Sequence, residues 1–257
     1  MHKVDLNSDL GESFGAYTLG MDSAIIACVS SVNVACGWHA GDPMVMEATV
    51  KLCKERGVAV GGHPSYPDLM GFGRRHMKLS FDEIRTYIKY QLGALMAFTK
   101  SYGLPLQHVS PHGAMGNFIN YDSEEAAAAV CTAVKELDPD IIVIGNAGGY
   151  MTKAAEAMGL RWASNVFVDR AYNDDYSLVA RGTPGAMIKD PDIAVERVVR
   201  MVKEGKVTSI TGKELDIQAH GVCVHGDTAT AVQVIRDIRA ALESEGITIA
   251  NIASVIG

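Results

Sequence analysis

This sequence lacks the features that direct a chain to a membrane or to nucleic acid. No window approaches the roughly 18 apolar residues of a membrane-spanning helix, and residues 1–12 carry charges where a secretory signal needs an apolar core. Lysine and arginine number 23 against 30 aspartate and glutamate, and no basic block or RNA-binding aromatic motif occurs. We therefore expect a cytoplasmic protein with neither nucleic acid nor membrane as a partner.

Cysteine is also scarce, and its spacing is informative. The five cysteines are odd in number, scattered and without a CxxC pair. This pattern argues against a disulfide framework and against a thiolate zinc site. We expect reduced thiols packed in the core at Cys28, Cys36, Cys53, Cys131 and Cys223.

Short motifs of several common enzyme classes are missing. The GFG of residues 71–73 does not continue as G-x-G-x-x-G, and no GxxxxGK[ST] occurs, so the usual cradles for dinucleotides and ATP are absent. The zinc-peptidase motif HExxH and the serine-hydrolase motif GxSxG are absent as well. A binding site for ATP therefore cannot be located by motif.

The chain does contain a regular alternation of strand and helix patterns. Helical patterns lie between most of the β-rich runs, which is typical of a parallel sheet. About seven such units in 257 residues favour an α/β fold with one closed (β/α) barrel domain over residues 1–257. A doubly wound open sheet has the same local pattern and stays open at this point. The expected strands cover residues 3–7, 31–36, 58–62, 107–111, 141–145, 162–168 and 220–224.

Capping signals predict where several helices begin and end. Asp42 before Pro43 is typical of an N-cap and first helical residue, and Ser80 with Glu83 forms a capping box. Only Gln91 interrupts the apolar stripe of the second of these helices. The expected helices run from Pro43 to Arg56, from Ser80 to Gly103, from Asp122 to Leu137, from Pro191 to near Gly205, and after Asp227 to near Gly246.

Ionisable residues gather just after the expected strands. In a parallel barrel these positions share the face at the carboxyl ends of the strands, where catalytic groups converge on one pocket. A single histidine beside glycine is more often structural, and we interpret His2, His76, His108 and His220 in that way. The candidates after strands are Asp9, Glu12, His39, His63, His112, Asp169, Arg170, His225 and Asp227.

Residues expected at this same face suggest two further kinds of site, one for an anion and one for a metal ion. In the loop of residues 63–75, a guanidinium of Arg74 is suited to clamp a carboxylate or a phosphate, whereas Arg75 is equally well explained as a solvated turn residue. Asp9, His39 and His63 together could make a divalent metal site, but their spacing is not diagnostic and identifies no metal.

Several long and unusual motifs occur along the chain. In order they are DLNSDLGESFGAY, NVACGWHAGDP, HPSYPDLMGFGRR, PHGAMGN, FVDRAY and VHGDT. In sequence and in order they resemble the motifs of the LamB/YcsF family, and they span nearly the whole chain. The resemblance implies a distorted seven-stranded, TIM-like (β/α) barrel related to sugar-processing enzymes and polysaccharide deacetylases.

The resemblance also implies an activity. Family members open the lactam ring of 5-oxo-L-proline to L-glutamate, with ATP as co-substrate and ADP and phosphate as products. They act in a complex with 5-oxoprolinase subunits B and C. ATP is chemically reasonable, because phosphoryl transfer to the carbonyl oxygen of a resonance-stabilised lactam turns that oxygen into a leaving group.

Mapped onto this chain, the resemblance implies roles for two groups of residues. Asp9 or His39 would activate water, and His63 or His112 would protonate the ring nitrogen or hold the oxyanion. Glu12 completes the catalytic group. The substrate-binding group comprises Asn7, Arg74, Asp169, Arg170, His225 and Asp227.

Two departures from the family pattern lie beside the expected site. Ser110 stands where the family usually has lysine, and Gly116 where it usually has tyrosine. Without the ammonium group of that lysine, the site would lack one partner for a phosphate or an oxyanion. This chain could therefore differ from other family members in its substrate or in its level of activity. Two other functions remain open: a metal-dependent deacetylase or amide hydrolase that needs no ATP, and a binding scaffold without catalysis.

Overall fold

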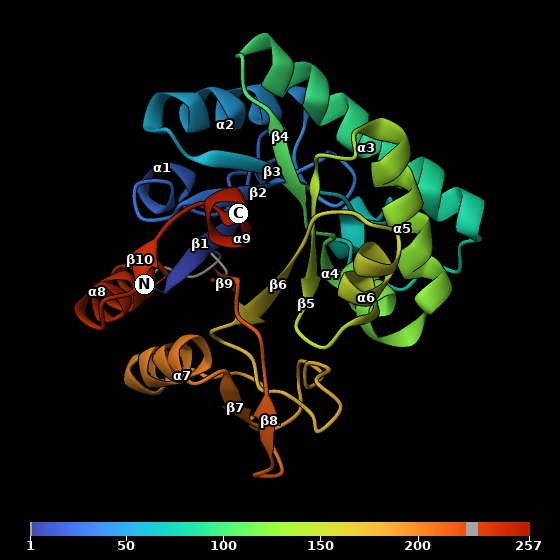
Figure 1. Cartoon of the computed structure of the whole chain (residues 1–257). Helices are drawn as coiled ribbons and strands as arrows, with labels where there is room; N and C mark the ends of the chain where they lie inside the picture. Colours follow the sequence, from blue (N-terminus) through green and yellow to red (C-terminus); the bar gives the residue numbers. More distant parts are fainter. Residues whose placement is uncertain (1, 225–230) are drawn as a thin grey trace.

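Seven parallel strands close into a barrel in the computed structural model, which describes residues 2–224 and 231–257. β1 pairs with β2 on one side and with β9 on the other, and Asn7 lies opposite both Ser31 and Cys223. The closed barrel is therefore confirmed and the open sheet is wrong (Figure 1). The strands are β1 (Lys3–Leu10), β2 (Ser31–Ala35), β3 (Ala59–His63), β4 (Leu106–Val109), β5 (Ile142–Asn146), β6 (Trp162–Phe167) and β9 (Gly221–Cys223).

Three short strands were not foreseen. β10 (Thr248–Ile249) pairs with Lys3 and Val4, the first two residues of β1, and the pairing of β1 with β9 begins at the next residue, Asp5. β7 (Lys206–Thr208) and β8 (Glu214–Asp216) form an antiparallel pair outside the barrel, beside α7 (Figure 1). Two or three residues are too few to show the alternating pattern by which a strand is recognised.

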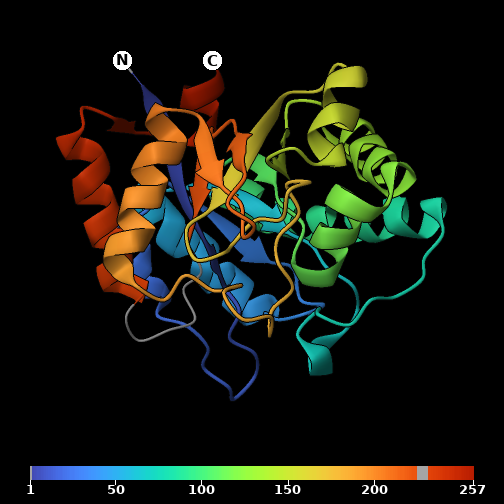
Figure 2. The same cartoon turned by 90° about the horizontal axis from the view of Figure 1, so that it is seen from below.

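Helices surround the barrel (Figures 1 and 2), and within the described residues none is long and apolar enough to cross a membrane. The longer ones are α2 (Pro43–Arg56), α3 (Phe81–Ser101), α5 (Glu124–Leu137), α6 (Tyr150–Ala157), α7 (Pro191–Lys203) and α8 (Ala231–Ser244). The shorter ones are α1 (Asp22–Ile25), α4 (Gly113–Asn117), α9 (Ile252–Ile256), a 3-10 turn (Leu69–Gly71) and a π-helical turn (Phe118–Asp122).

Most of the predicted caps are confirmed. The Asp42 carboxylate accepts hydrogen bonds from the backbone N–H groups of Met44 and Val45, and the Ser80–Glu83 capping box is complete. The predicted start at Asp122 is wrong, because this residue ends the π-helical turn and Ser123 caps α5 instead. The predicted start after Asp227 lies outside the described residues.

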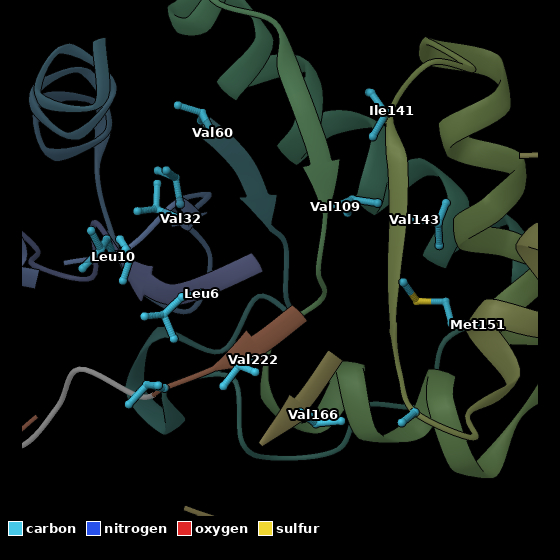
Figure 3. Close-up of a cluster of buried hydrophobic side chains, with 14 of the residues drawn as sticks. Leu6, Leu10, Val32, Val60, Val109, Ile141, Val143, Met151, Val166 and Val222 are labelled. Atoms are coloured by element: carbon cyan, nitrogen blue, oxygen red, sulfur yellow. The ribbon is translucent and has the colours of Figure 1, made fainter. Parts of the chain in front are cut away.

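An apolar layer between the strands and the surrounding helices forms the main core. Each strand contributes valine, leucine or isoleucine side chains to it, and Met151 of α6 contacts this layer beside Val143 (Figure 3). All five cysteines are buried and none is in a disulfide, as predicted. Burial of this layer is the dominant favourable term for the fold, because it removes apolar surface from water.

The interior of the barrel is divided into a polar and an apolar part. Asp5, Asn7, Asn33, His108 and Asn165 are almost fully buried and are linked by side-chain hydrogen bonds. On the β5–β6 side the interior is apolar, and Ile252 of α9 packs there against side chains from both strands. Both chain ends and α9 lie at one end of the barrel, opposite the loops that follow the strands (Figure 2).

Candidate active site at the carboxyl ends of the strands

A pocket of about 510 Å³ lies at the carboxyl ends of the strands. Residues in the last positions of β1, β3 and β5 and residues after β4 and β6 contribute to its wall, including Asp9, His63, Asn146, His112 and Arg170. Its volume falls in the range usual for small-molecule sites. The structure thus brings together side chains that the sequence placed after separate strands.

Three histidines and one glutamate form a compact cluster at this pocket. The potential ligand atoms of Glu12, His39, His63 and His112 all lie within 4.8 Å of one another. His63 Nε2 is 2.9 Å from His112 Nδ1, and His39 Nε2 is 3.3 Å from Glu12 Oε1. The three imidazoles are almost fully buried, and His39 Nδ1 has no hydrogen-bond partner among the residues that the structure describes.

Backbone carbonyls fix the orientation of two of the imidazoles. His63 Nδ1 lies 2.5 Å from the carbonyl oxygen of Ser110, and His112 Nε2 lies 2.9 Å from that of Phe72. A carbonyl only accepts, so each of these nitrogens donates an N–H. In neutral rings the facing atoms His63 Nε2 and His112 Nδ1 would both present lone pairs, and only a proton or another cation between them relieves the repulsion.

The charges around the cluster differ from one imidazole to the next. Burial lowers the pKa of His63, but Asp9, whose Oδ2 is 3.3 Å from Nε2, raises it together with Glu12 and the Ser110 carbonyl, and the net effect is a raised pKa. Burial and the charge of His63 hold the pKa values of His39 and His112 well below the usual range. In the protein alone, His63 is therefore the imidazole of the three that is protonated most readily.

A network inside the barrel positions Asp9. Asn33 Nδ2 donates to Asp9 Oδ1 at 2.9 Å, and His108 Nε2 lies 2.9 Å from Asn33 Oδ1. Burial lowers the pKa of His108 to about 3, so this ring is a neutral donor. The structural interpretation of His108 agrees with this geometry, whereas the role of Asn33 was not foreseen from the run of apolar residues around it.

Gln91 explains the interruption of the apolar stripe on α3. Its Oε1 accepts from Ser65 N at 2.9 Å, and its Nε2 donates to Ser65 O at 3.0 Å. This amide therefore ties the loop of residues 63–75 to α3 two residues after His63. A polar residue at an otherwise apolar helical position was the sequence signal for this contact.

The arginines of that loop have different environments. Arg74 lines the pocket, and its guanidinium carbon is 5.1 Å from the ring centroid of Phe72. Arg75 forms a salt bridge with Asp68, with Nε 2.9 Å from Oδ1, and so is a structural member of the loop.

A second group of polar residues lines the pocket after β6. Arg170 is only 6% exposed, and one of its terminal nitrogens donates to the Val179 carbonyl at 2.6 Å. Its Nε is buried and has no hydrogen-bond partner among the residues that the structure describes. Arg181 and Tyr121 line the same pocket, and burial raises the pKa of Tyr121, which keeps its hydroxyl neutral. This part of the wall is suited to an anionic group.

For the remaining predicted substrate-binding residues that it describes, the structure shows no direct sign of a role in the pocket. Asn7 is fully buried in the barrel interior and bonds to Asp5 and Asn165, so contact with a substrate stays a prediction. Asp169 is half-buried after β6. His225 and Asp227 lie outside the described residues.

The fold and the pocket define a class: (β/α) barrel proteins with a histidine–carboxylate centre at the carboxyl ends of the strands. The chain belongs to the LamB/YcsF family, whose model matches residues 4–257.

Comparisons with individual proteins agree with this assignment. The chain is 54% identical over 256 residues to the A subunit of 5-oxoprolinase from Campylobacter jejuni, with 100% of both chains covered. It resembles the crystal structure of the lactam utilization protein from Thermus thermophilus, with a TM-score of 0.91, 45% identity and coverage of 96% and 99%. A family 4 carbohydrate esterase from Streptomyces lividans shares only the fold, with a TM-score of 0.50, 14% identity and coverage of 96% and 91%.

Proposed function

We propose that this chain is one component of an ATP-dependent 5-oxoprolinase that opens 5-oxo-L-proline to L-glutamate, with ADP and phosphate as the other products, and that residues 1–257 act as one domain. Full-length similarity to proteins named as the A subunit of 5-oxoprolinase supports the reaction. The observation that carries the proposal is a single pocket with Asp9 and His63 in one part of its wall and Arg170 in another.

This arrangement matches the chemistry of the lactam. The substrate has one carboxylate and one ring amide, so a guanidinium is needed for the first and proton-transfer groups for the second. Arg170, with Arg74 at the loop, would hold the carboxylate through charge-assisted hydrogen bonds. The ring amide would then lie toward Asp9 and His63.

The residues suggest how the C–N bond is broken. The Asp9 carboxylate, held by Asn33, would take a proton from the attacking water, and His63 would give a proton to the ring nitrogen as that bond breaks. Transfer of the ATP phosphoryl group to the carbonyl oxygen would activate the carbonyl carbon for addition of this water. Cleavage of the C–N bond would then leave γ-glutamyl phosphate, from which a second water would release phosphate to give L-glutamate. Because the sequence has neither of the usual nucleotide-binding motifs, we propose that subunits B and C supply the phosphoryl-transfer site.

Reconstitution tests this function. Glutamate release from 5-oxoproline is measured with this chain, both partner subunits and ATP. Turnover should require all components, and Asp9→Asn should lower kcat by about 100-fold or more, in the range typical of general-base catalysis. The control Asp140→Asn changes an exposed residue and should retain full activity. Absence of glutamate from the complete wild-type mixture would refute the proposal.

The histidine–glutamate cluster favours a second candidate, a metal-dependent deacetylase or other amide hydrolase that needs no ATP. The two candidates differ in one measurable requirement. Hydrolysis of acetylated sugars or simple amides without ATP and without partner subunits would support the second candidate. Strict dependence of turnover on ATP would support the first.

A further inference from the structure

We propose that Glu12, His39, His63 and His112 bind one divalent ion of the first transition row at the pocket. The proposal goes beyond the lactam reaction, because it concerns the isolated chain and requires neither ATP nor partner subunits. While an ion is bound, His63 Nε2 is a ligand and carries no proton, so the proton transfer proposed for His63 belongs to the ion-free protein. It rests on the distances within the cluster, on the contacts that orient its rings and on the chemistry of its donor atoms.

The distances match a shared ion. Ligand atoms that sit about 2.0–2.2 Å from one ion are separated from each other by roughly 3–4 Å. In the cluster, His63 Nε2 is 2.9 Å from His112 Nδ1, His39 Nε2 is 3.3 Å from Glu12 Oε1, and His112 Nδ1 is 4.0 Å from the same oxygen. Four donors from three different loops and one strand end therefore lie within 4.8 Å of one another.

The second nitrogens of two of the three histidines are held as metal-binding histidines require, whereas His39 Nδ1 has no hydrogen-bond partner among the described residues. A ligating imidazole almost always donates its other N–H to a carbonyl or a carboxylate, which fixes the ring and directs the lone pair at the ion. His63 donates to the Ser110 carbonyl and His112 to the Phe72 carbonyl. Both remaining lone pairs then point at the centre of the cluster, where an ion removes their mutual repulsion.

The donor set indicates the class of ion. Three imidazoles and one carboxylate suit zinc, cobalt, nickel or iron, whereas calcium and magnesium prefer oxygen ligands throughout. The Asp9 carboxylate lies next to the cluster, 3.3 Å from His63 Nε2, and both residues line the pocket. An ion held here would polarise a carbonyl oxygen or a bound water at the place where a substrate enters.

A cobalt titration of the isolated chain tests the proposal. The wild-type protein is stripped with a chelator, loaded with Co²⁺ and passed through a desalting column, and the retained cobalt and the visible absorption are measured. We expect one cobalt per chain and a d–d band that disappears when Zn²⁺ displaces the cobalt. The variants Glu12→Gln, His39→Gln, His63→Gln and His112→Gln should each weaken binding by about ten-fold or more.

His76→Gln provides the matched control, because His76 is exposed and lies outside the cluster. It should bind cobalt as the wild type does. Equal retention of cobalt by wild type and by the four cluster variants would overturn the proposal, as would the absence of a d–d band from loaded wild-type protein. The wild-type spectrum decides the matter even if a variant fails to fold. Since no lactam is present, this result is separate from that of the glutamate assay.

Discussion

The ring of His39 stacks on the ring of His112, with centroids 3.8 Å apart and an angle of 6° between the planes. The two residues follow different strands, and the loop that contains Gly73 packs against both. At Gly73 φ is +62°, and an added Cβ would overlap Ser65 Oγ and lie 2.8 Å from His39 Cβ and 2.9 Å from His112 Cδ2. Only glycine fits here, because any other residue would collide with Ser65 and with both histidines.

Gly73→Ala should therefore lower the free energy of unfolding by more than the backbone strain of the substitution alone. Gly103→Ala is the matched control, since its φ is +66° but nothing lies within 4 Å of the added Cβ. Both variants carry the left-handed strain of about 1–2 kcal/mol, and overpacking adds about 1–3 kcal/mol for Gly73 alone. Urea unfolding measures the difference, and equal destabilisation of the two variants would contradict the prediction.

Gln91→Leu should destabilise the protein although it extends an apolar stripe. The buried N–H and carbonyl of Ser65 would lose their partners, which costs about 1–3 kcal/mol per unsatisfied group. Gln233→Leu, at an exposed position of α8, should change the free energy of unfolding by no more than about 0.5 kcal/mol. If Gln91→Leu proves as stable as wild type, the amide does not hold the loop.

Asp5 should make stability depend on pH. Burial raises its pKa from 3.8 to about 6, and hydrogen bonds from Ser31, Ser30 and Asn7 offset only part of this. The folded protein favours the protonated carboxyl, so this stabilisation is complete below about pH 4 and is lost as the pH rises through about 6.

The variant Asp5→Asn isolates this effect because its amide does not titrate. The free energy of unfolding of wild type minus that of the variant should fall by about 2 kcal/mol between pH 4 and pH 7. Urea titrations of both proteins across this range supply the measurement. A difference that stays constant with pH would show that the carboxyl is not perturbed.

Arg170→Lys should weaken substrate binding with little effect on the chemical step. Lysine keeps the charge but cannot reproduce the planar fork of donors, so KM for 5-oxoproline should rise by about 10-fold or more while kcat changes little. Arg161→Lys, next to β6 at the opposite end of the barrel, is the control and should leave KM unchanged. A fall in kcat at constant KM would assign Arg170 a different role.

Much of the scaffold could be predicted because its signals are local. The β-rich runs, the caps at Asp42 and Ser80, and the position of histidines after strands all depend on residues near one another in sequence. The hairpin of β7 and β8 was missed because its strands are too short to show a period. The predicted start of α5 at Asp122 was wrong because a π-helical turn extends to Asp122, and the N-cap is the next residue, Ser123.

The order of strands and polar strand ends, read from the amino acids alone, determined that ionisable side chains gather at one face of a barrel. Which of them touch was decided only by the tertiary structure. The carbonyls of Phe72 and Ser110 orient His112 and His63, and Glu12 meets His39, through contacts between segments that are distant in sequence. Side-chain periodicity reports which face a residue occupies, whereas hydrogen-bond geometry depends on how closed strands and packed loops place atoms to within a few tenths of an ångström.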